Sequence, residues 1–189
     1  MKLDILMVGV GGQGTVLSSN IVCDVALANG FDVKKSEIHG MAQRGGSVVT
    51  HIRVGEEVFS PTIPLKSADI IVSFERMEFL RYAEYKNNDT VLILNSQEIA
   101  PPSVADGTAA YPEDKIAEAK KAFSKVYETD AISKAVEIGN PKVAGMIVLG
   151  ILAKSVPFKK EAWEQAIRDR VPAKTIELNL KAFDLGYSI

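Results

Sequence analysis

Near its start the chain carries a glycine-rich stretch, Val8-Gly9-Val10-Gly11-Gly12-Gln13-Gly14, from which the rest of the predicted fold follows. The residues before it, Leu3 to Val8, form a short apolar run that predicts a buried strand. The residues after it, Thr15 to Asn29, carry apolar side chains at helical spacing. The stretch is therefore a G-x-G-x-x-G turn between a first strand and a first helix.

Glycine suits such a turn because the backbone must bend tightly, and because a Cβ atom would hold a ligand or a neighbouring backbone away. The N-terminus of the helix directs N–H groups and a partial positive charge into the turn, so the turn can hold an anion such as phosphate. A tight turn that binds nothing fits the glycines as well. The binding candidates here are Gly9, Gly11, Gly12, Gln13 and Gly14.

The composition predicts one domain over residues 1–189 and excludes several classes of protein. A hydrophobic fraction of 47% is ordinary for a globular protein, and 22 basic against 24 acidic residues give a net charge of −2. No basic stripe occurs, which argues against nucleic acid as a partner. The N-terminus enters a strand at once, and the longest apolar run, Val143 to Ala153, is too short to cross a bilayer. We expect a cytoplasmic protein that does not contact a membrane.

The residues that commonly perform catalysis are few. Cys23 is the only cysteine, so it cannot form an internal disulfide or hold an iron–sulfur cluster, and we expect a small buried side chain. The two histidines, His39 and His51, lack the spacing of metal ligands, and His51 lies on a predicted strand, which favours a structural role. No serine or cysteine has the surroundings of a nucleophile. We predict no catalytic residue and no metal site in this chain.

The middle of the chain predicts an antiparallel element. Phe31 to Ser36 is predicted to form a second strand, and Glu37 to Gly46 has neither helical nor strand periodicity. Ser47 to Val54 alternates between apolar and polar residues, as a half-buried strand does. Gly55-Glu56 can turn that strand back onto Glu57 to Phe59, which predicts a hairpin.

In the remainder of the chain, strands and helices alternate. Buried strands are predicted at 70–74 and 91–94, with a short one at 124–128. Helices are predicted over 75–85, 112–123, 130–138, 140–155, 159–170 and 173–185, the last ended by Gly186. This order predicts a single three-layer α/β/α Rossmann-like domain, with a mostly parallel sheet that includes an antiparallel hairpin.

Ligands of such sheets bind beyond the carboxyl ends of the strands. That rule selects the glycine turn, the segment from Glu37 to Gly46, Phe74-Glu75 and Asn95-Ser96, and Asn140 can approach the same edge.

Three side chains of the 37–46 segment each allow two interpretations. Glu37 follows the second strand, where dinucleotide folds keep a ribose-binding acid, but it could equally be a solvated loop carboxylate. His39 suits a proton shuttle or an interface contact, and equally a hydrogen-bonded surface histidine. Arg44, which precedes two glycines, suits phosphate or carboxylate recognition, with a surface ion pair as the alternative.

Two stretches together resemble the small (beta) subunits of indolepyruvate:ferredoxin oxidoreductases, the separate-chain form of the gamma domain of 2-oxoacid:ferredoxin oxidoreductases. They are the glycine turn and Ser36-Glu37-Ile38-His39-Gly40-Met41-Ala42-Gln43-Arg44-Gly45-Gly46-Ser47-Val48, of which the second is far more specific. The likeness covers essentially the whole chain, through Ser60-Pro61, Ala68-Asp69, Phe74-Glu75, Gly139-Asn140-Pro141, Asn179-Leu180-Lys181-Ala182-Phe183 and Gly186-Tyr187. Gly145 departs from an asparagine that is common in the family, which puts a ligand role at that position in doubt.

The resemblance implies that an aryl 2-oxoacid such as indolepyruvate is decarboxylated on thiamine diphosphate, with magnesium. Electrons would pass through 4Fe–4S clusters to ferredoxin, and the acyl group to coenzyme A. This chain has neither a cysteine set nor a Gly-Asp-Gly motif, so those groups would belong to a large (alpha) subunit, and the chain alone would be inactive. The glycine turn and the loop with Gln43, Arg44, Gly45 and Gly46 would complete the active-site or coenzyme A side of the complex, or form the subunit interface.

Two alternatives remain open from the sequence. Gly9, Gly11, Gly14 and Glu37 suggest an independent NAD(P)- or flavin-binding enzyme, although the segment after the second strand does not continue a βαβ pattern. The chain could also be a non-catalytic interaction module whose glycine loops form only an interface. Self-association is compatible with the hydrophobic fraction of 47%.

The Arg44→Ala variant tests the role of the specific loop. We expect it to lower the turnover or the assembly of the complex, because a guanidinium that recognises a partner or an anion is lost, while the free energy of unfolding stays within about 0.5 kcal/mol of wild type. Coupled activity, gel filtration and urea unfolding measure the three quantities. Wild-type turnover together with intact assembly would contradict this role.

Overall fold

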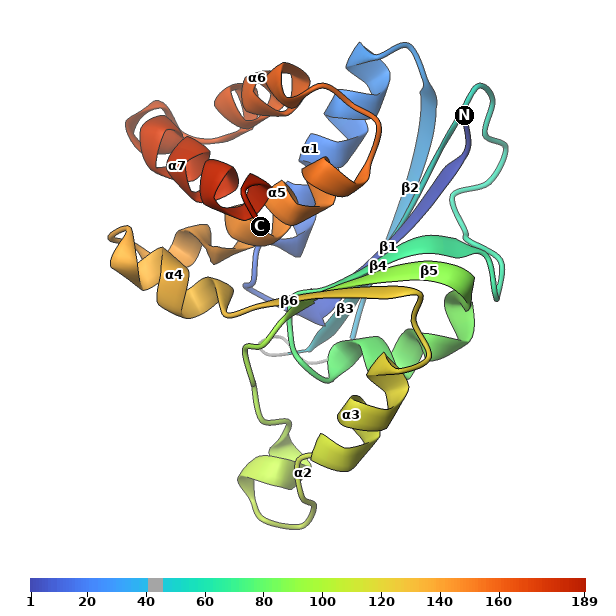
Figure 1. Ribbon diagram of the computed structural model, residues 1–189, viewed down its shortest axis with the longest axis vertical. Coiled ribbons are helices and arrows are strands. Elements are labelled where there is room, and N and C mark those ends of the chain that lie inside the picture. The colour runs from blue at the N-terminus through green and yellow to red at the C-terminus, as the bar shows by residue number, and fades with distance from the viewer. Residues whose placement is uncertain (41–45) are drawn as a thin grey trace.

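A six-stranded mixed sheet forms the centre of the computed structural model, which describes residues 1–40 and 46–189 (Figure 1). The strand order is β2-β3-β1-β4-β5-β6. β1, β4, β5 and β6 run parallel, whereas β3 is antiparallel to both of its neighbours. The strands are β1 (Leu3–Val10), β2 (Asp32–His39), β3 (Ser47–Gly55), β4 (Ala68–Ser73), β5 (Lys86–Asn95) and β6 (Lys125–Thr129).

Helices cover both faces of the sheet (Figure 1). One face carries α1 (Thr15–Ala28), α4 (Ala131–Glu137), α5 (Ala144–Ser155), α6 (Lys160–Arg170) and α7 (Ile176–Tyr187). The other carries the 3-10 helix η1 (Glu78–Tyr85) and α3 (Glu113–Lys120), while α2 (Pro102–Ala105) projects beyond them. Two further 3-10 turns, η2 (Pro141–Val143) and η3 (Ala173–Thr175), precede α5 and α7. The predicted three-layer α/β/α domain is therefore confirmed.

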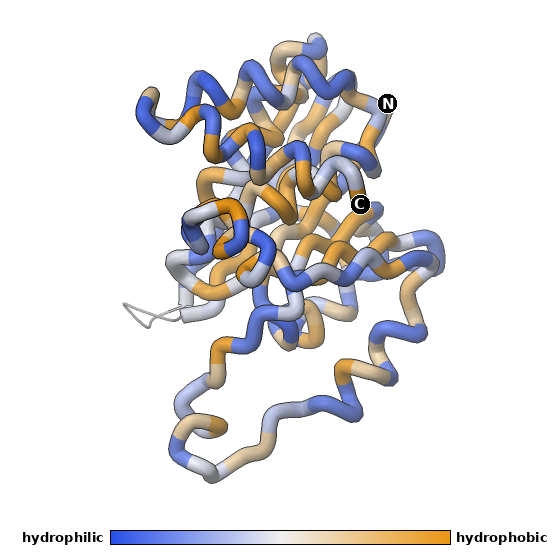
Figure 2. The backbone as a smooth tube through the Cα atoms, turned by 60° about the vertical axis from the view of Figure 1, so that its left-hand side comes forward, coloured by the Kyte–Doolittle hydropathy of each residue, from blue (hydrophilic) through white to orange (hydrophobic). Residues whose placement is uncertain are grey.

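β1 holds the two cores together because it is buried along its whole length. Ile5 and Met7 point into the larger core, under α1 and α5, whereas Leu6 and Val8 point into the smaller core, under η1 and α3. This alternation follows from the period of two in a strand. Figure 2 shows the hydrophobic residues gathered in the central strands. Across residues 1–40 and 46–189, no helix is both long and apolar enough to span a membrane.

The predicted antiparallel element is present, but the predicted hairpin of 47–54 with 57–59 is wrong, because the antiparallel partners of β3 are β2 and β1. β3 pairs with β2, and the expected return strand from Glu57 to Phe59 is irregular, with Phe59 87% exposed. β2 also extends through Glu37 to His39, which the sequence assigned to a loop. β2 is an edge strand that mixes charged and apolar residues, so its sequence lacks the alternation that marks a strand, and its pairing with β3 defines it instead.

Local signals predicted most helix ends correctly. The Asp130 carboxylate accepts a hydrogen bond from the Ser133 N–H, and Asn140 caps the next helix in the same way through the Lys142 N–H. Residues 75–85, predicted as an α-helix, instead form 3-10 turns from Glu78 onward, with Tyr82 outside helical geometry. The buried carboxylate of Glu75 accepts from the Met77 and Glu78 N–H groups and so holds the start of this segment.

The sequence predicts that Gly186 ends the last helix. In the structure Gly186 instead lies inside α7. A Cβ atom at Gly186 would come within 1.9 Å of the Ile147 carbonyl oxygen of α5, and one at Gly150 within 2.2 Å of the Phe183 carbonyl oxygen. The two glycines therefore let the backbones of α5 and α7 approach each other closely, which explains their presence within helices.

The Gly186→Ala variant tests this contact. Alanine favours an isolated helix, but its methyl group must displace the α5 backbone, so we expect a net loss of about 2 kcal/mol or more in the free energy of unfolding. Urea unfolding measures the loss, and Lys181→Ala on the exposed side of α7 serves as the control. Equal or greater stability of Gly186→Ala would contradict the close approach.

Candidate functional site

The glycine turn lies at the carboxyl edge of the sheet, between the end of β1 at Val10 and the start of α1 at Thr15. Gly12 and Gly14 have φ values of 100° and 84°, a left-handed region in which side chains are strained. A Cβ atom at Gly9 would lie 2.9 Å from Oε1 of Gln13 and 3.0 Å from Cβ of Phe74. The Gly11 N–H donates to the Gly46 carbonyl oxygen at 3.0 Å, which ties the turn to the start of β3.

Gln13 is predicted as a binding residue, but its side chain forms hydrogen bonds within the protein. Its Oε1 accepts from the Val10 N–H at 2.8 Å, and its Nε2 donates to the Phe74 carbonyl oxygen and to Oε1 of Gln97, both at 2.8 Å. Both ends of the amide therefore have partners. Gln13 joins the ends of β1 and β4 to the segment that follows β5.

Asn95, at the end of β5, extends the same network. Its Nδ2 donates to the Phe74 carbonyl oxygen at 2.9 Å, and its Oδ1 accepts from the Ala131 N–H at 3.0 Å, at the start of α4. The Phe74 carbonyl thus accepts from both Gln13 and Asn95. These amides fix three strand ends and two helix starts relative to one another.

A hollow of about 530 Å³ lies at the N-terminus of α1. The glycine turn forms one side, and His39 and Arg170 are among the other lining residues. No side chain caps the helix at Gly14, so the first N–H groups of α1 lack an intrahelical acceptor. Arg170 forms a two-pronged ion pair with Asp24 at 2.5 and 2.7 Å, so its charge is already compensated. The free N–H groups at the start of α1 are what suits an anion here.

Glu37 lies with Lys35 and His39 on one face of β2. Its Oε1 is 3.0 Å from Nε2 of His39, and its Oε2 is 3.5 Å from Nζ of Lys35, which also donates to Oδ1 of Asn20 at 2.6 Å. In a dinucleotide fold the acid follows a strand that adjoins the first strand. Here β3 separates β2 from β1, so Glu37 stands one strand farther away from the glycine turn than that comparison assumed.

Glu75 is a buried carboxylate whose role the sequence did not predict. Its Oε2 accepts from the Met77 and Glu78 N–H groups, and its Oε1 accepts from the Ile99 N–H at 3.1 Å and the Tyr111 hydroxyl at 2.7 Å. Burial and this hydrogen bond raise the pKa of Tyr111. The sequence signal was available, because Glu75 lies just beyond the largely apolar strand β4, after Phe74.

The other candidates divide into three groups. Gln43, Arg44 and Gly45 lie outside the described residues. Gly46 is described, and its carbonyl oxygen accepts a hydrogen bond from the glycine turn. His51 is buried, which lowers its pKa, and its Nδ1 accepts from the Ile63 N–H, in keeping with the structural role expected. Gly145 packs beneath the turn, where a Cβ atom would lie 3.1 Å from the Gln13 carbonyl oxygen.

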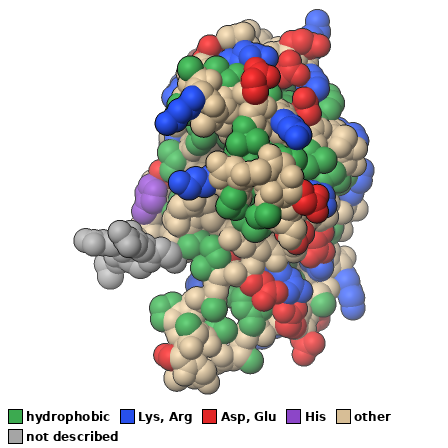
Figure 3. All heavy atoms as spheres, turned by 90° about the vertical axis from the view of Figure 1, so that its left-hand side faces the viewer, with side chains coloured by type: hydrophobic (Ala, Val, Ile, Leu, Met, Phe, Trp, Pro, Cys, Tyr) green, Lys and Arg blue, Asp and Glu red, His purple; other side chains and the backbone are tan. Residues whose placement is uncertain are grey.

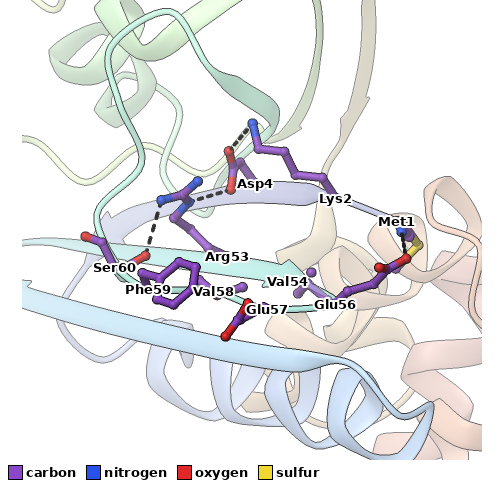
Figure 4. Close-up of a pocket in the computed structure, with 11 residues that line it drawn as sticks. Met1, Lys2, Asp4, Arg53, Val54, Glu56, Glu57, Val58, Phe59 and Ser60 are labelled. Carbon is purple, nitrogen blue, oxygen red and sulfur yellow. Dashed lines mark hydrogen bonds and ion pairs between the residues drawn. The ribbon is translucent and has the colours of Figure 1, made fainter.

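A further cavity, of about 630 Å³, lies at the opposite, amino end of the sheet (Figure 4). Its centre is the buried carboxylate of Asp4, which pairs with Nε of Arg53 at 2.8 Å and Nζ of Lys2 at 3.0 Å. Both cations therefore pair with one carboxylate within the wall, and Phe59 projects beside them. The cavity shares no residue with the glycine turn.

The Gln13→Glu variant tests the amide network. A carboxylate in this place faces two acceptor oxygens, so we expect a loss of about 1–3 kcal/mol in the free energy of unfolding at neutral pH. These oxygens raise the pKa of the introduced carboxyl in the folded state, so the loss should shrink as the pH falls. Urea unfolding at two pH values measures this, with exposed Asn88→Asp as the control. A loss no larger than the control's would refute the network.

Comparison of the sequence with known proteins identifies the family of this chain. Residues 4–189 match the family described as pyruvate ferredoxin/flavodoxin oxidoreductase. Indolepyruvate oxidoreductase subunit IorB of Archaeoglobus fulgidus is 43% identical over 192 aligned residues, which cover 100% of this chain and 95% of that protein. The subunit of the same name from Thermococcus kodakarensis is 37% identical, over 98% of this chain and 94% of that protein.

Solved structures show the same fold. The gamma subunit of a keto/oxoacid ferredoxin oxidoreductase from Geobacter sulfurreducens has a TM-score of 0.72 at 24% identity, and the alignment covers 98% of this chain and 96% of that chain. A 2-oxoglutarate:ferredoxin oxidoreductase from Magnetococcus marinus, solved with 2-oxoglutarate, coenzyme A and succinyl-CoA bound, has a TM-score of 0.77 at 18% identity. That alignment covers 99% of this chain but only 30% of the longer chain.

The resemblance inferred from the glycine turn and the 36–48 stretch is thereby confirmed. With a family match over residues 4–189 and a relative that is 43% identical across the whole of this chain, the chain belongs to the pyruvate ferredoxin/flavodoxin oxidoreductase family.

Proposed function

We propose that this chain is the small subunit of a 2-oxoacid:ferredoxin oxidoreductase that acts on aryl pyruvates such as indolepyruvate. The observation that carries the proposal is the 43% identity to an indolepyruvate oxidoreductase subunit over the full chain. The complex would decarboxylate the 2-oxoacid oxidatively, pass electrons to ferredoxin and transfer the acyl group to coenzyme A. We place this complex in the cytoplasm.

The reaction centre would belong to a large subunit. Thiamine diphosphate with magnesium and 4Fe–4S clusters require ligands that the described part of this chain does not offer, since no three His, Cys, Asp or Glu side chains gather there. The single cysteine, Cys23, does not fit a cluster either, because burial raises its pKa to about 11 and so disfavours the thiolate. The small subunit would therefore be inactive alone.

The carboxyl edge would be the working surface of the small subunit. The left-handed Gly12 and Gly14 and the uncapped N-terminus of α1 suit the phosphate groups of coenzyme A. The same edge also suits an interface with the large subunit. Coenzyme A binding and subunit contact are compatible if the large subunit covers this edge. Gly9 and Gln13 would act by shaping the turn, whereas Gly11, His39 and Gly46 would face the ligand or the partner, together with Gln43, Arg44 and Gly45.

The alternatives have less support. An independent NAD(P)- or flavin-binding enzyme needs its ribose-binding acid beside the first strand, and β3 occupies that position. An interaction module without influence on the chemistry remains an outcome of the experiment below, as does self-association of the chain.

Reconstitution with the large subunit tests the proposal. Purified large subunit, titrated with this chain, should gain ferredoxin-reducing activity until the two are equimolar. Indolepyruvate should be preferred over pyruvate and 2-oxoglutarate in kcat/KM, and this chain alone should give no turnover.

Three results would count against the proposal. Full activity of the large subunit without this chain would support the interaction module. Turnover or cofactor binding by this chain alone would support the independent enzyme. A preference for pyruvate or 2-oxoglutarate would replace the substrate class while leaving the subunit role intact.

A further inference from the structure

The segment from Gln97 to Tyr111, which we call the arm, projects from the body of the molecule below the sheet (Figures 1 and 2). None of its residues is fully buried, although Ile99 and Tyr111 at its two ends are half-buried. The arm carries two charged residues, Glu98 and Asp106, of which only Asp106 lies beyond Ile99, in a chain that is 24% charged. Figure 3 accordingly shows little charge on the projecting part, where hydrophobic side chains lie among uncharged polar ones and backbone. Depletion of charge is typical of an interface core rather than of a solvated loop.

The arm is nevertheless fixed to the body and to itself. Glu75 binds both of its ends, through the Ile99 N–H at 3.1 Å and the Tyr111 hydroxyl at 2.7 Å. Within the arm, the Ala109 N–H and the Thr108 hydroxyl both donate to the Ser103 carbonyl oxygen, at 2.7 and 2.9 Å. A segment held in place without burying its own side chains is preorganised for a partner, because less entropy remains to be lost on binding.

A groove of about 470 Å³ lies between the arm and the body. Val10 and Met77 line it from the body, and Pro101 and Ala105 line it from the arm. Val10 is also the last residue of β1, so the groove continues the edge that carries the glycine turn. It lies on the η1 face of the sheet, opposite the hollow at α1.

The polar groups in this groove define the charge of its occupant. Glu78 is buried, and its carboxylate accepts from the Ser47 hydroxyl at 2.5 Å and from Nε of Arg81 at 3.0 Å. Arg81 lines the groove, and its side chain is 50% exposed although Nε is bound to Glu78. A guanidinium in this position pairs well with an incoming carboxylate.

We propose that this groove docks an apolar segment of the large subunit, with a carboxylate of that segment on Arg81. The inference rests on the proposed function and adds the surface through which the subunits meet. The uncharged walls of the groove favour an apolar segment, and Arg81 favours a carboxylate on it. The large subunit is selected because the same fold forms only 30% of the longer Magnetococcus marinus chain, where it must lie beside other domains.

Binding of the groove variants to the purified large subunit tests the inference. Ala105→Glu places a charge on the apolar wall, and Arg81→Glu reverses the charge that receives the partner. Each should weaken the affinity at least about tenfold by calorimetry or light scattering. Leu65→Glu, which alters an exposed leucine just before β4, is the matched control and should bind as wild type does. Thermal unfolding of each free variant checks that the fold is retained. Arg81→Gln, which removes the charge without placing a second carboxylate against the buried Glu78, separates lost pairing with the partner from lost stability.

A photo-crosslinker at Ser103 identifies the occupant. Crosslinks to the large subunit are expected, whereas crosslinks to a second copy of this chain would overturn the inference. Wild-type affinity of both Ala105→Glu and Arg81→Glu would overturn it as well. If the wild-type chain binds no large subunit at all, the proposed function fails instead, so the two failures are distinguishable.

Discussion

The side-chain amide of Gln13 holds the carboxyl edge of this sheet together. It bonds to the end of β1 through Val10, to the end of β4 through Phe74 and to the segment after β5 through Gln97. Asn95 continues the network to the start of α4. Each such bond contributes about 1 kcal/mol, but bonds that share an acceptor in a partly buried site reinforce one another. The shape of the glycine turn, and of the hollows beside it, depends on this network.

The chemistry of the chain is consistent with that architecture. Its buried carboxylates, Asp4, Glu75 and Glu78, all have cationic or hydrogen-bonding partners within the protein, and its cysteine is held as a thiol. What the carboxyl edge offers is shape, helix N–H groups and an arm that carries little charge. These are features for holding a ligand or a partner in position. They fit a subunit that completes a reaction centre supplied by another chain.

Local signals in the sequence predicted much of this fold, and non-local contacts account for the errors. The strand, turn and helix around Gly9 to Gly14, the buried strands and the Asp130 and Asn140 caps follow from periodicity and capping. The partner of β3 and the extent of β2 depend on pairing between distant residues, and Gly186 is explained only by its contact with α5. At the site, Gln13 was identified as important, but its engagement with Phe74 and Gln97 required the tertiary structure.

The most direct test of the subunit assignment is purification of the tagged chain from its native host, followed by mass spectrometry and visible absorption. Our account predicts that a large polypeptide co-elutes, that the complex is brown from iron–sulfur clusters, and that it contains thiamine diphosphate. A colourless chain that elutes alone or as a homodimer would contradict the account.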